Sequence, residues 1–186
     1  MNYRELRKGH VFEHEGEAYV VTENEHITPG NWRGMCQVKM KSVKTGAVIQ
    51  RRFRPNEKVE LIWVDKKEMQ YLYQDGGNYV FMDMKTFEQT PLNAEMLGNN
   101  AQWLVPNITV NVESYDGRII NVNLPDTIEM EVTETDPVIK GQTATNQYKP
   151  AILETGVKVM VPPFISQGEK IRVDTRDGKY LERAKS

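Results

Sequence analysis

The chain has little of what disulfide bonding, metal binding and membrane insertion require. Its 186 residues include one cysteine, Cys36, so no disulfide can form within the chain, which is typical of a reducing compartment. One cysteine and three histidines do not provide the paired spacing of a zinc site. No apolar run approaches membrane-spanning length, and residues 1–5 do not resemble a signal peptide. We therefore expect a cytoplasmic protein that binds no metal and contacts no membrane.

The usual catalytic motifs are also missing. The chain has neither a glycine-rich phosphate loop followed by Lys-Ser/Thr nor a Gly-x-Ser-x-Gly elbow, and Cys36 lies on the apolar side of a predicted strand, as a packed thiol does. His10 and His14 lie in a strand pattern, which places the two rings on one face about 13 Å apart. An acidic run alternates as the solvent side of a strand does, rather than forming a carboxylate pair: Glu129, Glu131, Glu134 and Asp136. The sequence thus favours a binding protein without a cofactor over an enzyme.

Charge is distributed unevenly, although the whole chain has a net charge of only −2. Residues 1–64 carry a net charge of +3, residues 65–128 carry −5, and residues 129–186 are neutral. From Arg33 to Lys58 there are eight Lys or Arg residues and one acid. A basic surface of this kind suits contact with a phosphate backbone, and the alternative is an ordinary solvated hairpin face.

The segment 28–58 is predicted to contain this basic hairpin and an exposed turn. A Pro-Gly pair and a following glycine indicate a tight turn at 28–34 that directs large side chains outward. Beyond it, one face of a strand is apolar and the other polar, with Cys36, Val38 and Met40 opposite Gln37, Lys39 and Lys41. Lys44-Thr45-Gly46 then turns the chain into a return strand at 47–53. We expect Trp32 to stack on a base or sugar while Arg33 pairs with a phosphate, although Trp32 folding back onto the hairpin is the alternative.

Short alternating segments separated by turns run through the rest of the chain. Strands are predicted at 11–12, 18–21, 59–64, 68–73, 79–82, 101–105, 108–115, 118–124, 128–132, 157–161, 170–173 and 180–181. A short helix is predicted at 87–98 and a loop at 140–148, and the apolar strand patterns around Trp63 and Trp103 predict that both are core residues. These patterns indicate β-rich domains at 1–64, 65–127 and 128–186. Three such domains in a row would span about 75–80 Å, about the length of a folded transfer RNA.

These motifs together make the chain similar to bacterial elongation factor P over its whole length. The most specific ones lie in the last third: Lys140-Gly141, Thr143-Ala144, Lys149-Pro150-Ala151, Thr155-Gly156, Val161-Pro162, Phe164, Gly168-Glu169, Val173-Asp174-Thr175-Arg176, Gly178, Tyr180 and Arg183. Others are Lys44-Thr45-Gly46, Tyr71-Leu72-Tyr73, Asp75-Gly76 and Thr86-Phe87-Glu88-Gln89.

The resemblance implies an all-β fold of three small β-barrel domains in an L-shaped, tRNA-like arrangement. The domain at 1–64 would be SH3-like (KOW), and the domains at 65–127 and 128–186 would be OB folds. The resemblance also implies a translation elongation factor, not an enzyme, that binds the ribosome between the peptidyl and exit sites. It would promote peptide-bond formation at consecutive prolines by positioning the peptidyl-tRNA. The implied partners are ribosomal RNA of both subunits, the peptidyl-site tRNA, the exit-site mRNA codon and an enzyme that modifies the turn, and we expect a monomer.

Several site residues follow from the resemblance. The turn that faces the acceptor end of the peptidyl-tRNA consists of Pro29, Gly30, Asn31, Trp32, Arg33 and Gly34. Candidate contacts to RNA phosphates are Lys39, Lys41, Arg51 and Arg52. The loop on the codon side consists of Lys140, Gly141, Gln142, Thr143, Ala144 and Thr145. Tyr180 and Arg183 match positions at the small-subunit end, with plain strand packing as the alternative for Tyr180.

Two segments depart from the family pattern. Family members carry a modified lysine or arginine directly after the Pro-Gly pair, whereas this chain has Asn31, which cannot carry either modification in the same way. Either the turn works unmodified, with Trp32 and Arg33 providing reach and charge, or it shifts and Arg33 is modified. The loop after Thr-Ala, glycine-rich in the family, reads Thr-Asn-Gln-Tyr at 145–148, which leaves its codon contacts open.

Two other functions stay open at this point. One is a paralogue that acts on other stalling sequences, which the unusual turn allows. The other is an RNA-binding module without a ribosomal role, which would bind free RNA tightly. The acidic middle third argues against the second, because it would repel an RNA backbone wrapped along the full length.

Overall fold

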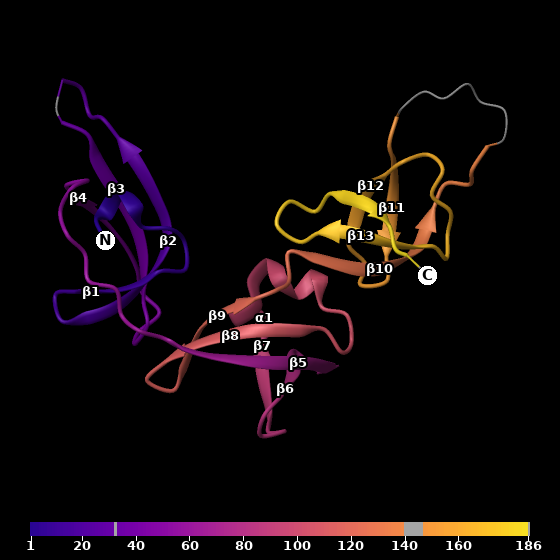
Figure 1. Ribbon diagram of the computed structural model, residues 1–186, viewed down its shortest axis with the longest axis horizontal. Coiled ribbons are helices and arrows are strands. Elements are labelled where there is room, and N and C mark those ends of the chain that lie inside the picture. Colours follow the sequence, from indigo (N-terminus) through magenta and orange to yellow (C-terminus); the bar gives the residue numbers. More distant parts are fainter. Residues whose placement is uncertain (32, 140–146, 186) are drawn as a thin grey trace. The chain divides into compact units, whose positions relative to one another are not determined.

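The computed structural model describes residues 1–31, 33–139 and 147–185, and within them the chain is an all-β, multi-domain protein (Figure 1). Its strands form three curled antiparallel sheets that follow one another along the sequence. The chain divides into two compact units, Met1–Lys67 with Val112–Asn121 and Glu68–Asn111 with Val122–Ser186. In the part of the chain that is described, no helix is long and apolar enough to cross a membrane. The division into domains at residues 64 and 127 stays a prediction.

The first sheet has the strand order β1-β2-β3-β4. Its strands are β1 (Val11–His14), β2 (Glu17–Ile27), β3 (Met35–Ser42) and β4 (Val48–Phe53). The predicted alternation is confirmed in β3, where Cys36, Val38 and Met40 are buried while the residues between them face outward. The 3-10 helix η1 (Tyr3–Glu5) closes the core, because the Tyr3 ring stacks on Phe53 with 3.9 Å between centroids.

The predicted strand at 59–64 is wrong. This segment makes an isolated bridge, Phe12 to Leu61, with the Ile62 amide donating to the Val11 carbonyl at 2.8 Å and the Glu13 amide donating to the Glu60 carbonyl at 3.4 Å. The Val59 amide donates separately to the Met1 carbonyl at 3.1 Å, and no continuous ladder forms. Its neighbour β1 is only four residues long, so the segment 59–64 has no strand along which it could form a continuous ladder. Trp63 is 88% exposed, and its prediction as a core residue is therefore also wrong.

The middle sheet has the order β7-β6-β5-β8-β9. Its strands are β5 (Asp65–Asp75), β6 (Asn78–Asp83), β7 (Gln89–Asn93), β8 (Thr109–Tyr115) and β9 (Arg118–Asn123). The two predicted hairpin turns, at Asp75–Asn78 and at Asp116-Gly117, are confirmed. Between β8 and β9, Asp116 and Gly117 both have left-handed backbone angles, φ 50° and 72°, which is the conformation that an Asp-Gly hairpin turn favours.

Between residues 87 and 105 the predicted helix and strand differ from the elements that the structure shows. The predicted helix is reduced to α1 (Ala94–Leu97), in which the Asn93 side chain accepts a hydrogen bond from the Met96 amide. Its predicted first half is instead the strand β7, in which Pro91 is tolerated because β7 is an edge strand. The predicted strand at 101–105 is wrong, because the 3-10 helix η2 (Gly98–Trp103) occupies most of it.

The third sheet has the order β12-β11-β10-β13-β14. Its strands are β10 (Thr127–Thr135), β11 (Lys149–Leu153), β12 (Lys158–Val161), β13 (Lys170–Asp174) and β14 (Tyr180–Arg183). Strand β11 was not predicted, since its Lys-Pro-Ala start lacks an alternating pattern. The acidic residues of β10 lie on its exposed face, as predicted. Of the predicted loop, residues 140–146 lie outside the described residues.

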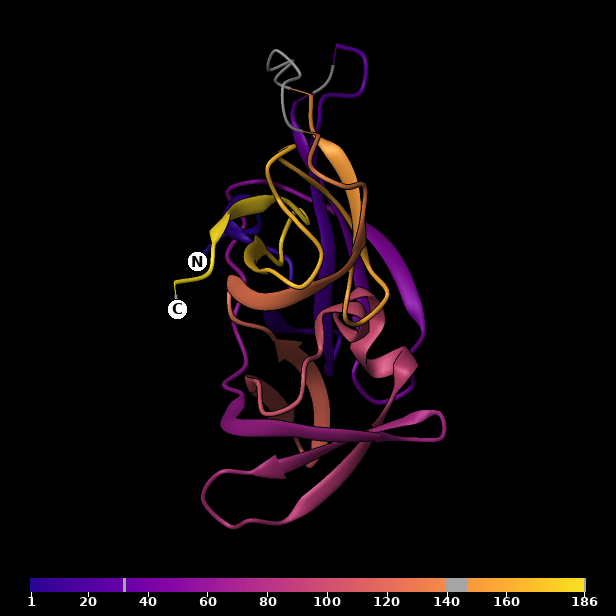
Figure 2. The ribbon, with the colours of Figure 1, turned by 90° about the vertical axis from the view of Figure 1, so that its right-hand side faces the viewer.

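Trp103 is a core residue, as predicted, but it packs in the core of the third sheet rather than of its own. The ring contacts a buried cluster that includes Met130 and Ile171, and Figure 2 shows the pink helical segment beside β10. The Thr155 hydroxyl donates to the Gln102 carbonyl at 2.6 Å, which ties η2 to the turn after β11. The η2 segment that follows the middle sheet's β7 therefore contributes to the core of the third sheet within the second unit.

Candidate nucleic-acid interface

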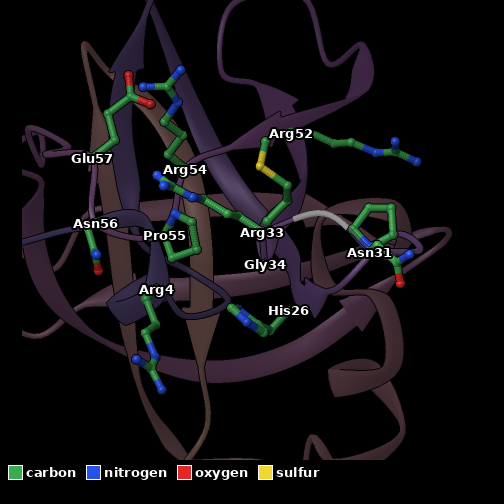
Figure 3. A pocket seen from close by; sticks show the side chains of 12 residues that line it. Arg4, His26, Asn31, Arg33, Gly34, Arg52, Arg54, Pro55, Asn56 and Glu57 are labelled. Atoms are coloured by element: carbon green, nitrogen blue, oxygen red, sulfur yellow. The ribbon is translucent and has the colours of Figure 1, made fainter.

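An open groove of about 1530 Å³ lies at the turn between β2 and β3 and is called the arginine groove below (Figure 3). One wall is the turn itself, with Pro29, Asn31, Arg33, Gly34 and Met35. The turn closes the β2–β3 ladder, whose last pair is Ile27 and Met35. Gly30 has φ 55°, a left-handed conformation that favours glycine. Trp32 lies outside the described residues.

Gly34 permits a close approach between the turn and β2. A Cβ atom at this position would lie 2.7 Å from the Nε2 atom of His26, which also lines the groove. Because glycine has no Cβ, the imidazole ring can lie directly against the backbone. A larger residue at Gly34 would therefore displace His26 from this wall.

The opposite wall comes from the segment after β4 and from the start of the chain. Its lining residues are Arg52, Arg54, Pro55, Asn56, Glu57 and Arg4. The Glu57 amide donates to the Arg54 carbonyl at 3.1 Å, which closes a turn. The Arg4 amide donates to the Pro55 carbonyl at 3.2 Å, and the Tyr3 amide donates to the Glu57 carbonyl at 3.1 Å. These bonds hold η1 against the turn and so bring two arginines distant in sequence to one groove.

The arginine groove carries positive charge that is not neutralised by the described residues. Four guanidinium groups line it with one carboxylate, Glu57. Arg52 donates through Nε to the Gln37 side-chain oxygen at 3.3 Å, whereas Arg4, Arg33 and Arg54 form no ion pair with any described residue. Such a surface attracts anions, and the planar guanidinium group matches a phosphate especially well.

The arginines of the third sheet show the opposite arrangement. Arg172 contacts Glu129 and Glu182, each at 3.0 Å. Arg176 contacts Asp174 at 2.7 Å, and its hydrogen bonds lower the pKa of Asp174 to about 2. These charges are already satisfied within the protein. The contrast makes the first unit the better candidate for contact with a phosphate backbone.

The structure separates the predicted phosphate contacts. Arg52 lines the groove, and it shares a face of the sheet with Lys39 and Lys41, because Gln37 pairs with Arg52 across the β3–β4 ladder. Lys39 also lies opposite Glu23 of β2, and Lys41 lies toward the far end of β3. Arg51, next in sequence to Arg52, faces the other side of the sheet.

The predicted residues of the last third are placed differently. The loop residues Lys140, Gly141, Gln142, Thr143, Ala144 and Thr145 lie outside the described residues. Tyr180 packs against the third core, and burial raises the pKa of its hydroxyl. Arg183 donates to both carboxylate oxygens of Glu169, at 3.0 and 3.4 Å, and lies 4.8 Å from the Phe164 ring centroid. Its guanidinium group therefore already has partners within the protein.

Sequence reasoning did not single out Arg4 and Arg54. Arg54 belongs to the basic run between 33 and 58, so its charge was counted but its position was not predicted. No local pattern relates Arg4 to that run, because the two segments meet only in the folded chain, through the stacking of Tyr3 on Phe53 and the backbone hydrogen bonds of Tyr3 and Arg4. Among the described residues no group of three potential metal ligands is found.

Comparison with known proteins covers nearly the whole chain. Three family models match: the KOW-like domain of elongation factor P over residues 2–59, its OB domain over 64–122, and "Elongation factor P, C-terminal" over 128–183. The elongation factor P of Symbiobacterium thermophilum is 47% identical over 184 residues, covering 99% of this chain and 100% of that protein. The elongation factor P of Parvibaculum lavamentivorans is 45% identical over 184 residues, covering 99% and 98%.

A solved structure is also similar. It is described as eukaryotic translation initiation factor 5A from Methanococcus jannaschii, with a TM-score of 0.42 and 21% identity, covering 66% of this chain and 92% of that one.

Proposed function

Because this chain belongs to the elongation factor P family and is a translation elongation factor, we propose that it promotes peptide-bond formation at consecutive prolines. In this proposal it binds the ribosome in the cytoplasm, between the peptidyl and exit sites. The turn at 28–34 approaches the acceptor end of the peptidyl-tRNA. The partners are ribosomal RNA of both subunits and the peptidyl-site tRNA, and the loop at 140–145 contacts the exit-site codon.

The observation that carries the proposal is the uncompensated positive charge beside the turn. Arg33 lies in the turn and lines the groove without a carboxylate partner among the described residues. Asn31 lines the same groove and presents an amide, which can donate and accept hydrogen bonds. An RNA end offers phosphates and polar base edges, which match these two groups.

The proposed role needs no catalytic group of the protein's own. The ribosome joins the amino acids, and the factor holds one substrate in a reactive position. Fixing the geometry of a reactant can lower a barrier by several kcal/mol, up to about 7–11 kcal/mol in favourable cases. Orientation is therefore the property that the turn would supply.

The position of Asn31 leads us to propose that the turn works unmodified. A modified Arg33 is the competing explanation, and it would require an enzyme that acts on the turn. Intact mass of recombinant protein, and mass spectrometry of the peptide containing Arg33 from the native organism, distinguish the two. An added mass on native Arg33 would refute the unmodified turn.

The test of function is reconstituted translation of a triple-proline reporter with recombinant protein of confirmed unmodified mass. We expect full relief of stalling by the wild-type chain and none by Arg33→Ala, since that change removes the charge at the turn. Lys44→Ala is the matched control, because it removes one charge from the same sheet at the turn between β3 and β4 and should behave as wild type.

Two outcomes would count against the proposal. Normal relief of stalling by Arg33→Ala would refute the role of the turn. Absence of relief by the wild type, with ribosome binding retained and native Arg33 unmodified, would instead favour a paralogue that acts on other stalling sequences.

A further inference from the structure

Arg54 lies directly across the arginine groove from the turn. Figure 3 shows the Arg33 side chain extending from the turn toward the Arg54–Asn56 segment, while Arg52 extends to the other side. Neither Arg33 nor Arg54 has an ion-pair partner among the described residues. Two guanidinium groups on facing walls of one groove repel each other, and an anion between them removes that repulsion.

The backbone that presents Arg54 is well fixed. Strand β4 ends at buried Phe53, whose ring stacks on Tyr3 with planes only 4° apart. Pro55 follows directly and restricts the backbone, and its carbonyl accepts the Arg4 amide at 3.2 Å. The Arg54 carbonyl accepts the Glu57 amide at 3.1 Å. Arg54 is therefore held on a rigid support, unlike a charge on a free loop, and little backbone ordering is needed when it binds.

Glu57 makes the charge along the groove uneven. Its carboxylate is the one acidic group among the described lining residues and lies on the same wall as Arg54. A phosphate chain is repelled at Glu57 and attracted at Arg54 and Arg33. The groove thus favours a strand that enters between the two arginines over one that runs along the whole wall.

We propose that Arg54 is a positioning residue that forms, with Arg33, a two-arginine clamp on the phosphate backbone of the single-stranded 3′ end of the peptidyl-site tRNA. This rests on the proposed function and extends it to a residue of the body of the first sheet. Arg33 contacts the strand from the turn, and Arg54 contacts it from the opposite wall, where backbone hydrogen bonds fix the segment. The clamp would set how far the turn reaches along the RNA end.

The test is a cycle that combines protein variants with changes in the tRNA. Binding of the full chain is measured on ribosomes whose peptidyl-site tRNA is intact or shortened at its single-stranded 3′ end. We expect Arg54→Ala to weaken binding about tenfold on intact complexes and to have no effect on shortened ones, because a charge-assisted bond to phosphate is lost only in the first case. Arg54→Lys should restore most of the affinity, and Lys44→Ala should bind as wild type to both.

The outcomes separate this inference from the function on which it rests. Equal weakening of both complexes by Arg54→Ala would place its contact on ribosomal RNA and overturn the clamp. The clamp would also be overturned if Arg54→Ala bound both complexes with the same affinity as Lys44→Ala while the wild type still bound intact tRNA complexes more tightly. A wild type that does not distinguish the two tRNAs would overturn the proposed acceptor-end contact itself. Arg54 is exposed, so unchanged thermal unfolding of the variant is expected and serves as the check of its fold.

Discussion

Replacing Trp103 with alanine should strongly destabilise the second unit. A buried tryptophan removes about 150–250 Å² from water. At about 25 cal/mol per Å², this corresponds to about 4–6 kcal/mol, an upper bound because the unfolded chain already buries part of its apolar surface. Trp103 is 4% exposed and packs with the core of the third sheet. Since its ring also faces Gly178, whose added Cβ would lie 3.5 Å away, the site can close only partly, and we expect a loss of about 3–5 kcal/mol in the free energy of unfolding.

Urea unfolding followed by circular dichroism measures this loss. Trp63→Ala is the matched control, because it removes the same side chain from a position that is 88% exposed and should change stability by less than about 0.5 kcal/mol. Trp103→Phe should lie between the two, since it keeps an apolar ring. A loss below about 1 kcal/mol for Trp103→Ala, or equal losses for both alanine variants, would refute the contribution of Trp103 to the core of the third sheet.

Two further predictions concern titratable groups. Asp174→Asn should lower the melting temperature at neutral pH, because the hydrogen bonds from Arg176 hold the pKa of Asp174 at about 2, below the usual 3.8. The stabilisation is complete above about pH 5 and is lost as the pH falls through 2, so the difference from wild type should shrink in that interval; a difference that stays constant down to pH 2 would contradict the assignment. Cys36 is buried, and burial raises the pKa of its thiol, so a thiol-specific reagent should modify it on the order of a hundredfold more slowly in the folded protein than in urea. Rapid modification of the native chain would show that the core around Cys36 opens.

Much of the fold follows from local pattern. The alternation in β3 and β10 and the turns at Asp75–Asn78 and Asp116-Gly117 are all visible in the sequence, because side-chain period and turn conformation depend on neighbouring residues. The basic character of the hairpin and the family are visible for the same reason, since both are properties of residue order.

The errors occur where a distant partner decides the outcome. Trp63 and Trp103 lie in similar apolar patterns, yet one is exposed and the other buried. The difference arises because β1 is too short to extend a ladder along 59–64, whereas the core of the third sheet receives the Trp103 ring. Strand β7 formed where a helix was predicted because β6 offered a partner along its whole length.

The sequence by itself determined the strand-forming segments, the turns, the family and the positive charge of the first third, because these depend on residues close together in the chain. Only the tertiary structure decided which charges are available. The guanidinium group of Arg183 is paired with Glu169 and lies over the Phe164 ring. Arg4, Arg33 and Arg54 instead line one groove and have no carboxylate partner among the described residues. The availability of a charge depends on what folding brings within about 4 Å of it, and that neighbour is seldom adjacent in sequence.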